Sequence, residues 1–464
     1  MPDHDVVIIG GGISGLTALH FIRTRRPELS VMLYEAEKRL GGTVGTDRID
    51  GYSLDWGPNG FLDREPLTLQ LVDELGLGPH MERANANVSN RFILRLGKLR
   101  SVPMSPPKFL TSDILSWPGK LRVLKEPFAA RAPEGVDESI YDFGKRRIGR
   151  EAADYLIQPM VSGVYGGVAS KMSLRACFPT MHQMESQYGS LFKAMIAKMK
   201  QAKREGKKSG GPSGPGGWLT SFKGGLSRIT DELGQRYSDN ITVNRPVRNV
   251  SRQANSFVIQ FGDNSTTTAR ELILAVPSNH ASTITAGLST QLSQALDAIK
   301  YAPIAVVCFG YDAKNVRVNL DGFGFLVPSK EGKGILGSIW TSSIFSDRAP
   351  LGKVQFRSMV GGDGDHESAK LSDSELTALV RRDLDSIVGL NGDPELVKIY
   401  RWEHGIPQYH IGHLGRMQTI ERELQSIGGL HRTGNAYYGI SLNDCVKQSF
   451  KVVSSLTTQT IHHT

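Results

Sequence analysis

The chain has 464 residues, of which 39% are hydrophobic and 22% charged, so it is too apolar for a disordered protein and long enough for two or three domains. Glycine is frequent, with 51 residues or about 11% against a usual ~7%, which favours tight turns or backbone that a ligand approaches closely. Lys and Arg exceed Asp and Glu by 9 (55 against 46), which indicates an anionic partner without identifying it.

The three cysteines, Cys177, Cys308 and Cys445, are far apart and form no CxxC pair, which argues against a disulfide framework or a zinc site. No uninterrupted apolar run reaches the ~18 residues of a membrane-spanning helix. The first residues lead directly into an apolar strand and lack the pattern of a signal peptide. These features predict a reduced, intracellular protein that is soluble or attached to a membrane surface.

The first fifty residues carry a dinucleotide-binding pattern. Asp5–Gly10 reads as a buried parallel strand, the helix Leu16–Arg26 is stopped by a proline, and Ser30–Glu35 is a second strand. Between the first strand and the helix lies G-x-G-x-x-G, Gly10–Gly15, whose backbone and helix N-terminus suit a pyrophosphate. Glu35 ends the second strand, where it can accept hydrogen bonds from a ribose. The spacing predicts dinucleotide binding but does not separate NAD from FAD.

Later segments favour FAD over NAD. Just past the second strand, Arg39 precedes the glycine pair Gly41 and Gly42, a pattern similar to the segment that runs beside FAD in amine-oxidase-like flavoproteins. Gly57–Gly60 is a turn that can present backbone to a ring system. Leu430–Cys445 reads as a second strand, glycine-rich turn and helix, which a cofactor as long as FAD needs and a plain NAD enzyme does not.

The middle of the chain mixes helices with β-strands. We predict a helix over 64–85 whose apolar positions are stopped by Gly76, a hairpin over 91–100 around Gly97, mostly helix from Pro103 to Met199, and a flexible glycine-rich loop over 201–217. A helix opening after Thr220 and ending at Tyr237 follows. Strands are expected over 241–247, 256–262 and 270–276, and the last of these should return to the dinucleotide-binding sheet. A second, mixed sheet that forms the wall of a substrate pocket is expected from strands over 304–310, 323–328, 335–340 and 354–360.

One helical stretch, 190–200, has Leu191, Ala194, Met195 and Met199 near one face and lysines elsewhere. The stretch could lie in a membrane interface. From the pattern alone, a surface helix with its apolar face on the core is favoured over that interpretation.

Taken together, the motifs resemble oxygen-dependent protoporphyrinogen oxidases, which are FAD enzymes of the amine-oxidase-like superfamily. The resemblance covers nearly the whole chain and is weakest across 201–217. It is carried by Gly10–Gly15, Arg39–Gly42, Gly57–Gly60, Asn90–Phe92, Val161–Gly167, Gly322–Pro328, Gly405–Gly412 and Gly434–Cys445.

This resemblance implies an α/β fold with three interleaved regions. A Rossmann-like FAD-binding domain would comprise 1–75, 218–278 and 416–464. A mixed-sheet, α+β substrate domain would comprise 76–91 and 279–415. A helical region, 92–209, would associate with the membrane.

The resemblance also implies roles for single residues. Arg91 would pair with a propionate of the tetrapyrrole, Phe323 and Leu326 would enclose the macrocycle, Ile339 and Met359 would complete the apolar wall, Gly163 would leave room for a ring, and Asn59 would lie near the flavin. A flat apolar ring with carboxylates needs such a slot and a guanidinium at its mouth. The FAD-binding residues would be Gly10, Gly11, Gly12, Ile13, Ser14, Gly15, Glu35, Ala36, Arg39, Gly41, Gly42, Gly57, Pro58, Asn59, Gly60, Val247, Gly434, Asn435, Ile440, Ser441 and Leu442.

The implied reaction is the six-electron oxidation of protoporphyrinogen IX to protoporphyrin IX in three rounds, with O₂ as acceptor and H₂O₂ as product. The flavin would carry the redox chemistry, so no catalytic base is assigned. A coproporphyrinogen III oxidase is the nearest alternative, although such enzymes resemble this chain less at Arg91 and Phe323–Leu326. Another flavin amine oxidase or desaturase is a further alternative. A nucleic-acid binder would draw only on the net charge and has no supporting motif.

The remaining expectations concern partners and location. FAD is expected to be non-covalent, with Cys445 as a packing residue, and His404, His410 and His413 are interpreted as structural or surface residues rather than metal ligands. We expect a cytoplasmic protein at the inner face of the membrane, without a transmembrane helix. A homodimer and a hand-off of product to a ferrochelatase are further implied partnerships.

Overall fold

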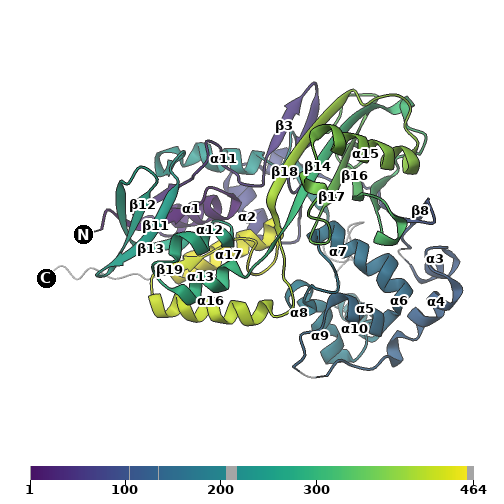
Figure 1. The fold of residues 1–464 in the computed structure, drawn as a ribbon, viewed down its shortest axis with the longest axis horizontal. Coiled ribbons are helices and arrows are strands. Elements are labelled where there is room, and N and C mark those ends of the chain that lie inside the picture. The colour runs from purple at the N-terminus through teal and green to yellow at the C-terminus, as the bar shows by residue number, and fades with distance from the viewer. Residues whose placement is uncertain (1, 104, 134, 205–216, 457–464) are drawn as a thin grey trace.

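A computed structural model describes residues 2–103, 105–133, 135–204 and 217–456. Two seven-stranded sheets and a group of helices make up most of the molecule, and Figure 1 shows them as three parts that meet near the centre. The expected α/β fold, with a Rossmann-like part and a mixed-sheet part, is confirmed.

The first sheet has the strand order β10-β2-β1-β13-β12-β11, with β19 added beside β13. Its strands are β1 (His4–Ile9), β2 (Val31–Tyr34), β10 (Ile241–Thr242), β11 (Val247–Gln253), β12 (Ser256–Phe261), β13 (Thr266–Leu274) and β19 (Leu430–Arg432). Strand β1 pairs in parallel with both β2 and β13, and β13 pairs in parallel with β19. The predicted return of the strand near 270–276 to the dinucleotide-binding sheet is therefore confirmed. Val6 to Ile9 are buried on both faces, which explains the unbroken apolar run of β1.

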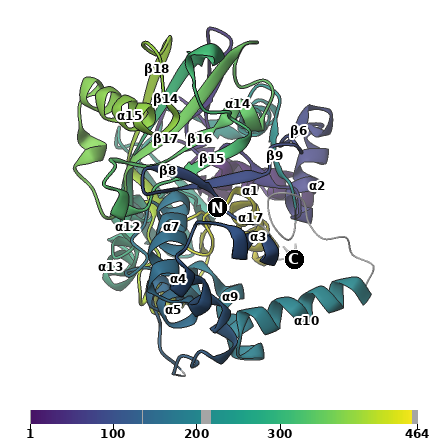
Figure 2. The same cartoon turned by 90° about the vertical axis from the view of Figure 1, so that its right-hand side faces the viewer.

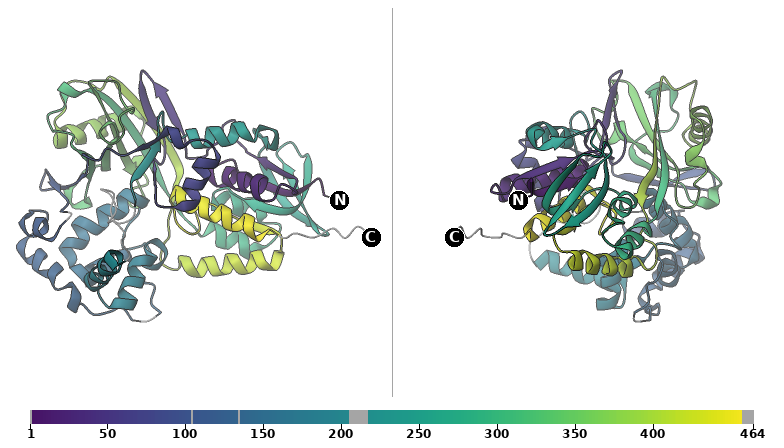
Figure 3. Two further views of the ribbon diagram at one scale, coloured as in Figure 1. Left: turned by 180° about the vertical axis from the view of Figure 1, so that it is seen from behind. Right: turned by 60° about the vertical axis from the view of Figure 1, so that its left-hand side comes forward.

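Helices cover both faces of this sheet. Leu19 of α1 and Val446 of α17 share one core, and Figures 1 and 3 show these two helices side by side although they lie at opposite ends of the sequence. Ala281 and Met417 belong to the core on the other face. The helices of the first face are α1 (Ile13–Arg25), α2 (Pro66–Glu74), α11 (Arg228–Arg236) and α17 (Leu442–Ser455), and those of the second are α12 (Ser278–Thr285), α13 (Thr290–Asp297) and α16 (His413–Ile427).

The second sheet has the order β18-β14-β17-β16-β15-β7-β8. Its strands are β7 (Asn90–Arg95), β8 (Lys98–Ser101), β14 (Tyr301–Asp312), β15 (Gly322–Leu326), β16 (Ile335–Trp340), β17 (Lys353–Gly361) and β18 (Leu396–Pro407). Helix α15 (Asp373–Val388) covers one face, where Leu384 shares a core with Phe325 and Phe309. The capping box of Ser372 and Glu375 at its start is a signal that the sequence analysis did not use. The opposite face lies toward the rest of the molecule.

The helical part consists of α3 (Pro106–Thr111), α4 (Trp117–Leu124), α5 (Ile140–Ile148), α6 (Arg150–Ala152), a π-helical turn (Ala153–Ile157), α7 (Gln158–Tyr165), α8 (Leu174–Cys177), α9 (Pro179–Tyr188) and α10 (Leu191–Arg204). Glu126 is fully buried and accepts hydrogen bonds from Arg147 Nε at 2.8 Å and from the backbone N–H of Leu191 at 2.9 Å. One carboxylate thus joins a buried arginine to the first turn of α10. Figure 2 shows α10 reaching outward from the other helices.

Several predicted boundaries are wrong. The helix expected over 64–85 ends at Glu74. The expected stop at Gly76, which has a positive φ of 71°, is thus confirmed, whereas the bound at 85 is wrong, because the chain continues through a 3₁₀ turn into strand β6 (Met81–Arg83). The segment from Thr220 is first a strand, β9 (Leu219–Phe222), which pairs with β6 and with β5 (Phe61–Leu62). The strand expected over 241–247 is split at Asn244, whose φ is 52°.

The flexible loop expected over 201–217 also differs at its start, since α10 continues through Arg204. The rest of that prediction, 205–216, lies outside the described residues. Two smaller elements complete the fold, namely the hairpin of β3 (Thr46–Ile49) and β4 (Tyr52–Asp55) and the short helix α14 (Thr341–Ile344). Among the helices of the described residues, none is long and apolar enough to cross a membrane.

Candidate active site

The glycine-rich turn after β1 is shaped by two close contacts. A Cβ at Gly15 would lie 1.9 Å from the carbonyl oxygen of Gly10, so only glycine lets α1 begin this close to the strand. Gly10 itself has a φ of 109°, and a Cβ there would lie 2.6 Å from the oxygen of Ala275. Gly12 is different, because the nearest described atom to a Cβ there is Cα of Gly42 at 3.9 Å. The turn is therefore tight at its ends and open at Gly12.

This open backbone fits a dinucleotide pyrophosphate. A Cβ at Gly434 would meet Ser14 Oγ at 4.0 Å as its nearest described atom, so Gly434 and Gly12 both present bare backbone beside the start of α1. The first turn of α1, from Ile13 to Leu16, is uncharged, and the positive end of the helix dipole is not neutralised from within. Backbone N–H groups and a helix N-terminus are the donors that phosphates use in such folds. The residues present thus fit FAD.

Glu35 lies against the same turn. Its Oε2 accepts a hydrogen bond from the N–H of Gly11 at 2.5 Å, and its Oε1 accepts one from the N–H of Glu37 at 2.9 Å. Ala36 is exposed beside it, and the segment that leads to Val247 crosses here, since the N–H of Arg245 donates to the carbonyl of Glu35 at 2.8 Å. The carboxylate is held at the turn, where a ribose would lie.

Arg39 shapes the loop that carries Gly41 and Gly42. Its guanidinium donates to the carbonyls of Leu40 at 2.7 Å and Val44 at 3.2 Å and to that of Gly42, and it stacks on the Trp56 ring at 4.2 Å. Gly41 forms a β-bridge with Gly12, so the loop lies directly beside the first glycine turn. Arg39 therefore acts on the backbone of this loop.

The turn Gly57–Gly60, which includes Pro58 and Asn59, is packed tightly at both ends. A Cβ at Gly57 would lie 2.3 Å from the oxygen of Thr43, and one at Gly60 would lie 2.6 Å from the oxygen of Thr220. Arg357 of β17 donates to the carbonyl of Gly57 at 2.5 Å. Arg357 is not among the residues predicted from the sequence, because an arginine within a strand has no local signal for such a contact.

The second sheet brings together the residues expected to bind substrate. Arg91 of β7 lies over the ring of Phe323, with 4.7 Å from its guanidinium carbon to the ring centre, and burial lowers the pKa of the guanidinium. Gly324 has a φ of 122°, and the pairing of β15 with β7 shifts register between Gly322 and Phe325. This bulge gives Phe323 and Leu326 similar, half-buried positions away from the core under α15.

Gly163, Ile339 and Met359 complete this wall. A Cβ at Gly163 of α7 would lie 2.4 Å from Cδ2 of Leu326, so the helix can cross the strand here only at glycine. Ile339 packs near Phe323, and Met359 is opposite Gly337 of the neighbouring strand β16. Asn59 lies outside these strands, in the turn Gly57–Gly60, and its expected place near the flavin stays a prediction.

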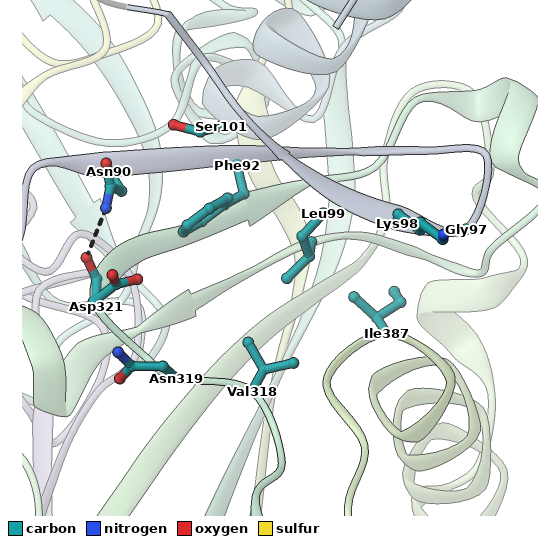
Figure 4. Close-up of a pocket in the computed structure, with 10 residues that line it drawn as sticks. All are labelled: Asn90, Phe92, Gly97, Lys98, Leu99, Ser101, Val318, Asn319, Asp321 and Ile387. Carbon is teal, nitrogen blue, oxygen red and sulfur yellow. Dashed lines mark hydrogen bonds between the residues drawn. The ribbon is translucent and has the colours of Figure 1, made fainter. Parts of the chain in front are cut away.

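A shallow hollow on the sheet lies elsewhere. It is lined by Phe92, Leu99, Val318 and Ile387, which border the core under α15, and Figure 4 shows Asn90 bonded to the carbonyl of Asp321 at its rim. Side chains alternate along β7, so Phe92 faces α15 while Arg91 faces away from it. The hollow is therefore separate from the candidate substrate wall.

The C-terminal loop is held by residues that the sequence analysis quoted without a role. Tyr409 donates to the carbonyl of Asn435 at 2.5 Å, and Gln408 donates to the carbonyl of Tyr165, at the end of α7, at 2.7 Å. Ser441 caps α17 in a capping box with Asp444, while Ile440 is half-buried and Leu442 is buried. The linker 408–409 thus connects the helix that carries Gly163 with the loop after Gly434.

Two groups with altered pKa values lie near this loop. Cys445 is buried in α17, and burial raises the pKa of its thiol to about 11, which disfavours the reactive thiolate. His413 is fully buried, donates through Nε2–H to the carbonyl of Tyr437 at 2.9 Å, and stacks on Tyr409; burial lowers its pKa to about 4. Because a carbonyl only accepts, Nε2 carries the proton of a neutral ring.

A model of the flavin containing amine oxidoreductases matches residues 13–455. The chain belongs to this family. The predicted flavin cofactor and the predicted oxidoreductase class are thereby confirmed. Such a chain can hold FAD through the open backbone at Gly12 and Gly434. These glycines lie in the turns between β1 and α1 and between β19 and α17.

Relatives carry two different names. The chain is 32% identical to a chloroplastic protoporphyrinogen oxidase of Oryza sativa subsp. japonica, over 98% of this chain and 88% of the relative. It is 30% identical to a coproporphyrinogen III oxidase of Bacillus subtilis, over 98% of each chain. A solved structure from Exiguobacterium sp. 255-15, provisionally named a protoporphyrinogen oxidase, superposes with a TM-score of 0.84 at 27% identity, covering 98% of this chain and 99% of that one.

Proposed function

We propose that this protein oxidises protoporphyrinogen IX to protoporphyrin IX, with FAD as cofactor and O₂ as acceptor. Six electrons and six protons leave the porphyrinogen, and three O₂ are reduced to three H₂O₂. The observation that carries the proposal is the half-buried pair of Arg91 and Phe323, which puts a cation at the end of an apolar wall. The family and the named relatives support it.

The wall suits a large ring with carboxylates at one edge. Leu326, Ile339 and Met359 offer apolar surface, and a Cβ at Gly163 would lie 2.4 Å from Leu326, so only glycine lets α7 pack this closely on the wall. Arg91 can bind a propionate through two parallel hydrogen bonds, a geometry that lysine lacks. Its stacking on Phe323 holds the guanidinium in place before substrate arrives.

The chemistry divides between cofactor and protein. When bound, FAD supplies the hydride acceptor for each two-electron round and passes the electrons to O₂. Arg91 anchors the substrate, while the apolar wall keeps water from the ring and limits its rotation. We assign no general base, since the pyrrole nitrogens of the substrate can exchange the protons themselves.

Oxidation of coproporphyrinogen III is a second candidate, favoured by one observation. The relative from Bacillus subtilis that bears this name matches over 98% of both chains, so the similarity spans nearly all of each. Coproporphyrinogen has four propionates instead of two. A site built for it should need more cations than Arg91 supplies.

Purified protein tests both candidates. Each porphyrinogen is supplied at equal concentration in air, and porphyrin formation is followed by fluorescence. We expect faster turnover of protoporphyrinogen IX, and a loss of that preference would transfer the assignment to coproporphyrinogen III. Lys98→Ala, an exposed lysine of β8 that pairs with Arg95 at the far end of β7 from Arg91, serves as a control for a lost surface charge and should match wild type.

We also propose that the helical part docks on an anionic membrane surface. Trp117, Leu121 and Phe128 are 66%, 57% and 88% exposed. On α10, Met195 and Met199 are 53% and 69% exposed. The expected packing of the apolar face of α10 on the core thus holds at Ala194 and at the half-buried Leu191, but not at these methionines. Lysines on the same helix suit anionic headgroups.

A vesicle experiment tests this docking. The variant Met195→Ser/Ile196→Ser/Met199→Ser should bind vesicles of mixed anionic and neutral lipid at least about tenfold more weakly than wild type. Leu351→Ser, a fully exposed position in the loop before β17, is the matched control and should bind as wild type does. Equal binding of wild type and the triple variant would contradict the proposal. We further propose the three interleaved domains with the boundaries given above and a cytoplasmic location. A homodimer and a hand-off of the product to a ferrochelatase are also part of the proposed function.

A further inference from the structure

Arg357 is a buried cation whose hydrogen bonds go to backbone. It lies on β17, is 5% exposed, and donates through Nε to the carbonyl of Asp55 at 3.1 Å. Its Nη2 donates to the carbonyl of Gly57 at 2.5 Å and, more weakly, to that of Trp56 at 3.4 Å. One side chain of the second sheet therefore holds three successive carbonyls of the segment that leads into the turn Gly57–Gly60.

The neighbouring carboxylate is engaged by other groups. Asp55 is 2% exposed, and its Oδ1 accepts from Thr46 at 2.7 Å and from the N–H of Leu226 at 3.0 Å, while its Oδ2 pairs with Arg348 at 3.2 Å. Arg348 and Asp55 form a buried ion pair. Arg357 adds a second positive charge beside that ion pair. Its hydrogen bonds go to the carbonyls of Asp55, Trp56 and Gly57 and not to a carboxylate.

Keeping such a charge away from water is costly. Burial lowers the pKa of Arg357, which reports this cost, yet a guanidinium remains protonated at neutral pH. Arg357 is paired across the sheet with Ile339, and Met359 follows two residues later on the same strand. The cation thus lies where the wall proposed for the substrate meets the turn proposed for the flavin.

We propose that Arg357 is a positioning residue for the flavin, which fixes the carbonyls of Asp55–Gly57 and places a positive charge beside the turn 57–60. The proposal rests on the proposed placement of that turn against the ring system. A buried positive charge there stabilises the reduced, more negative cofactor relative to the oxidised one. Arg357 thereby raises the reduction potential of the bound flavin.

The test uses flavin-loaded protein without porphyrinogen. For Arg357→Met we expect the affinity for reduced FAD to fall about tenfold more than that for oxidised FAD, which lowers the two-electron potential by about 30 mV. Arg357→Lys keeps the charge but cannot reach three carbonyls. Its potential should stay near that of wild type, while its FAD dissociates several-fold faster.

The matched controls are Arg348→Met and Arg348→Lys, in the same buried junction. Removing Arg348 breaks the pair with Asp55, so we expect a lower melting temperature with a smaller change of potential than Arg357→Met causes. An unchanged potential in Arg357→Met, or an equal shift in both Met variants, would overturn the proposal. If the Met variants do not fold, the rates of FAD release from Arg357→Lys and Arg348→Lys are compared. Equal release rates in these two variants would also overturn the proposal. A failure of the porphyrinogen assignment would show separately, as wild-type protein with bound flavin and no porphyrin product.

Discussion

The guanidinium of Arg91 lies 4.7 Å from the centre of the Phe323 ring, although 231 positions separate the two residues in the sequence. Parallel pairing of β7 with β15 brings them together, and the bulge at Gly324 turns Phe323 toward Arg91. The contact defines the polar end of the proposed substrate wall, and each residue of that wall can be tested separately.

Replacing Arg91 with alanine should raise KM for protoporphyrinogen IX by about tenfold or more, because a charge-assisted bond to a carboxylate contributes about 1.5–3 kcal/mol. FAD should stay bound, since Arg91 lies on the second sheet. Steady-state kinetics and the flavin spectrum measure both effects. Arg91→Lys should restore only part of the loss, and kinetics equal to wild type would remove Arg91 from the site.

Gly163→Ala should lower turnover, because the new Cβ would lie 2.4 Å from Leu326 and push that side chain into the slot. We expect kcat/KM to fall at least about tenfold, with a melting temperature close to that of wild type if Leu326 can move. Gly415→Ala on α16 is the control, because a Cβ there meets no described atom within 4 Å. Full activity in Gly163→Ala would show that the slot does not depend on Leu326.

Gly12→Val should yield folded protein without flavin. Gly12 has an ordinary φ of −72°, so a side chain is tolerated by the backbone but fills the space left for the pyrophosphate. The measurement is the absorbance ratio at 280 and 450 nm together with circular dichroism. A yellow variant with a normal spectrum would contradict the pyrophosphate assignment.

His413 should make stability depend on pH below neutrality. Burial lowers its pKa from 6.5 to about 4, so the unfolded chain binds a proton more readily than the folded one between these values. The stabilisation is complete above pH 6.5 and is lost as pH falls toward 4, by at most about 3 kcal/mol. Urea unfolding at several pH values should show this slope in wild type and a shallower one in His413→Gln. Equal slopes would contradict the burial of a neutral imidazole.

The sequence by itself determined those elements of the fold that depend on residues adjacent in the chain. The apolar run of β1, the spacing from Gly10 to Glu35 and the second glycine-rich turn before α17 each predict their structure, because a strand, a tight turn and a helix start depend mainly on neighbours along the chain. The hairpin at Gly97 is confirmed for the same reason, with Leu96 and Gly97 both at positive φ.

Tertiary structure decided what depends on distant pairing. Nothing near Arg357 in the sequence indicates that it bonds to Gly57, and nothing near Gly163 indicates that Leu326 fills the space beside it. The exposure of Met195 and Met199 likewise follows from what packs nearby. Periodicity records that a residue is apolar or charged, whereas burial and partner choice arise only when segments hundreds of residues apart are packed together. The glycines therefore predicted the turns that we propose for the cofactor, and the fold alone determined which side chains meet across them.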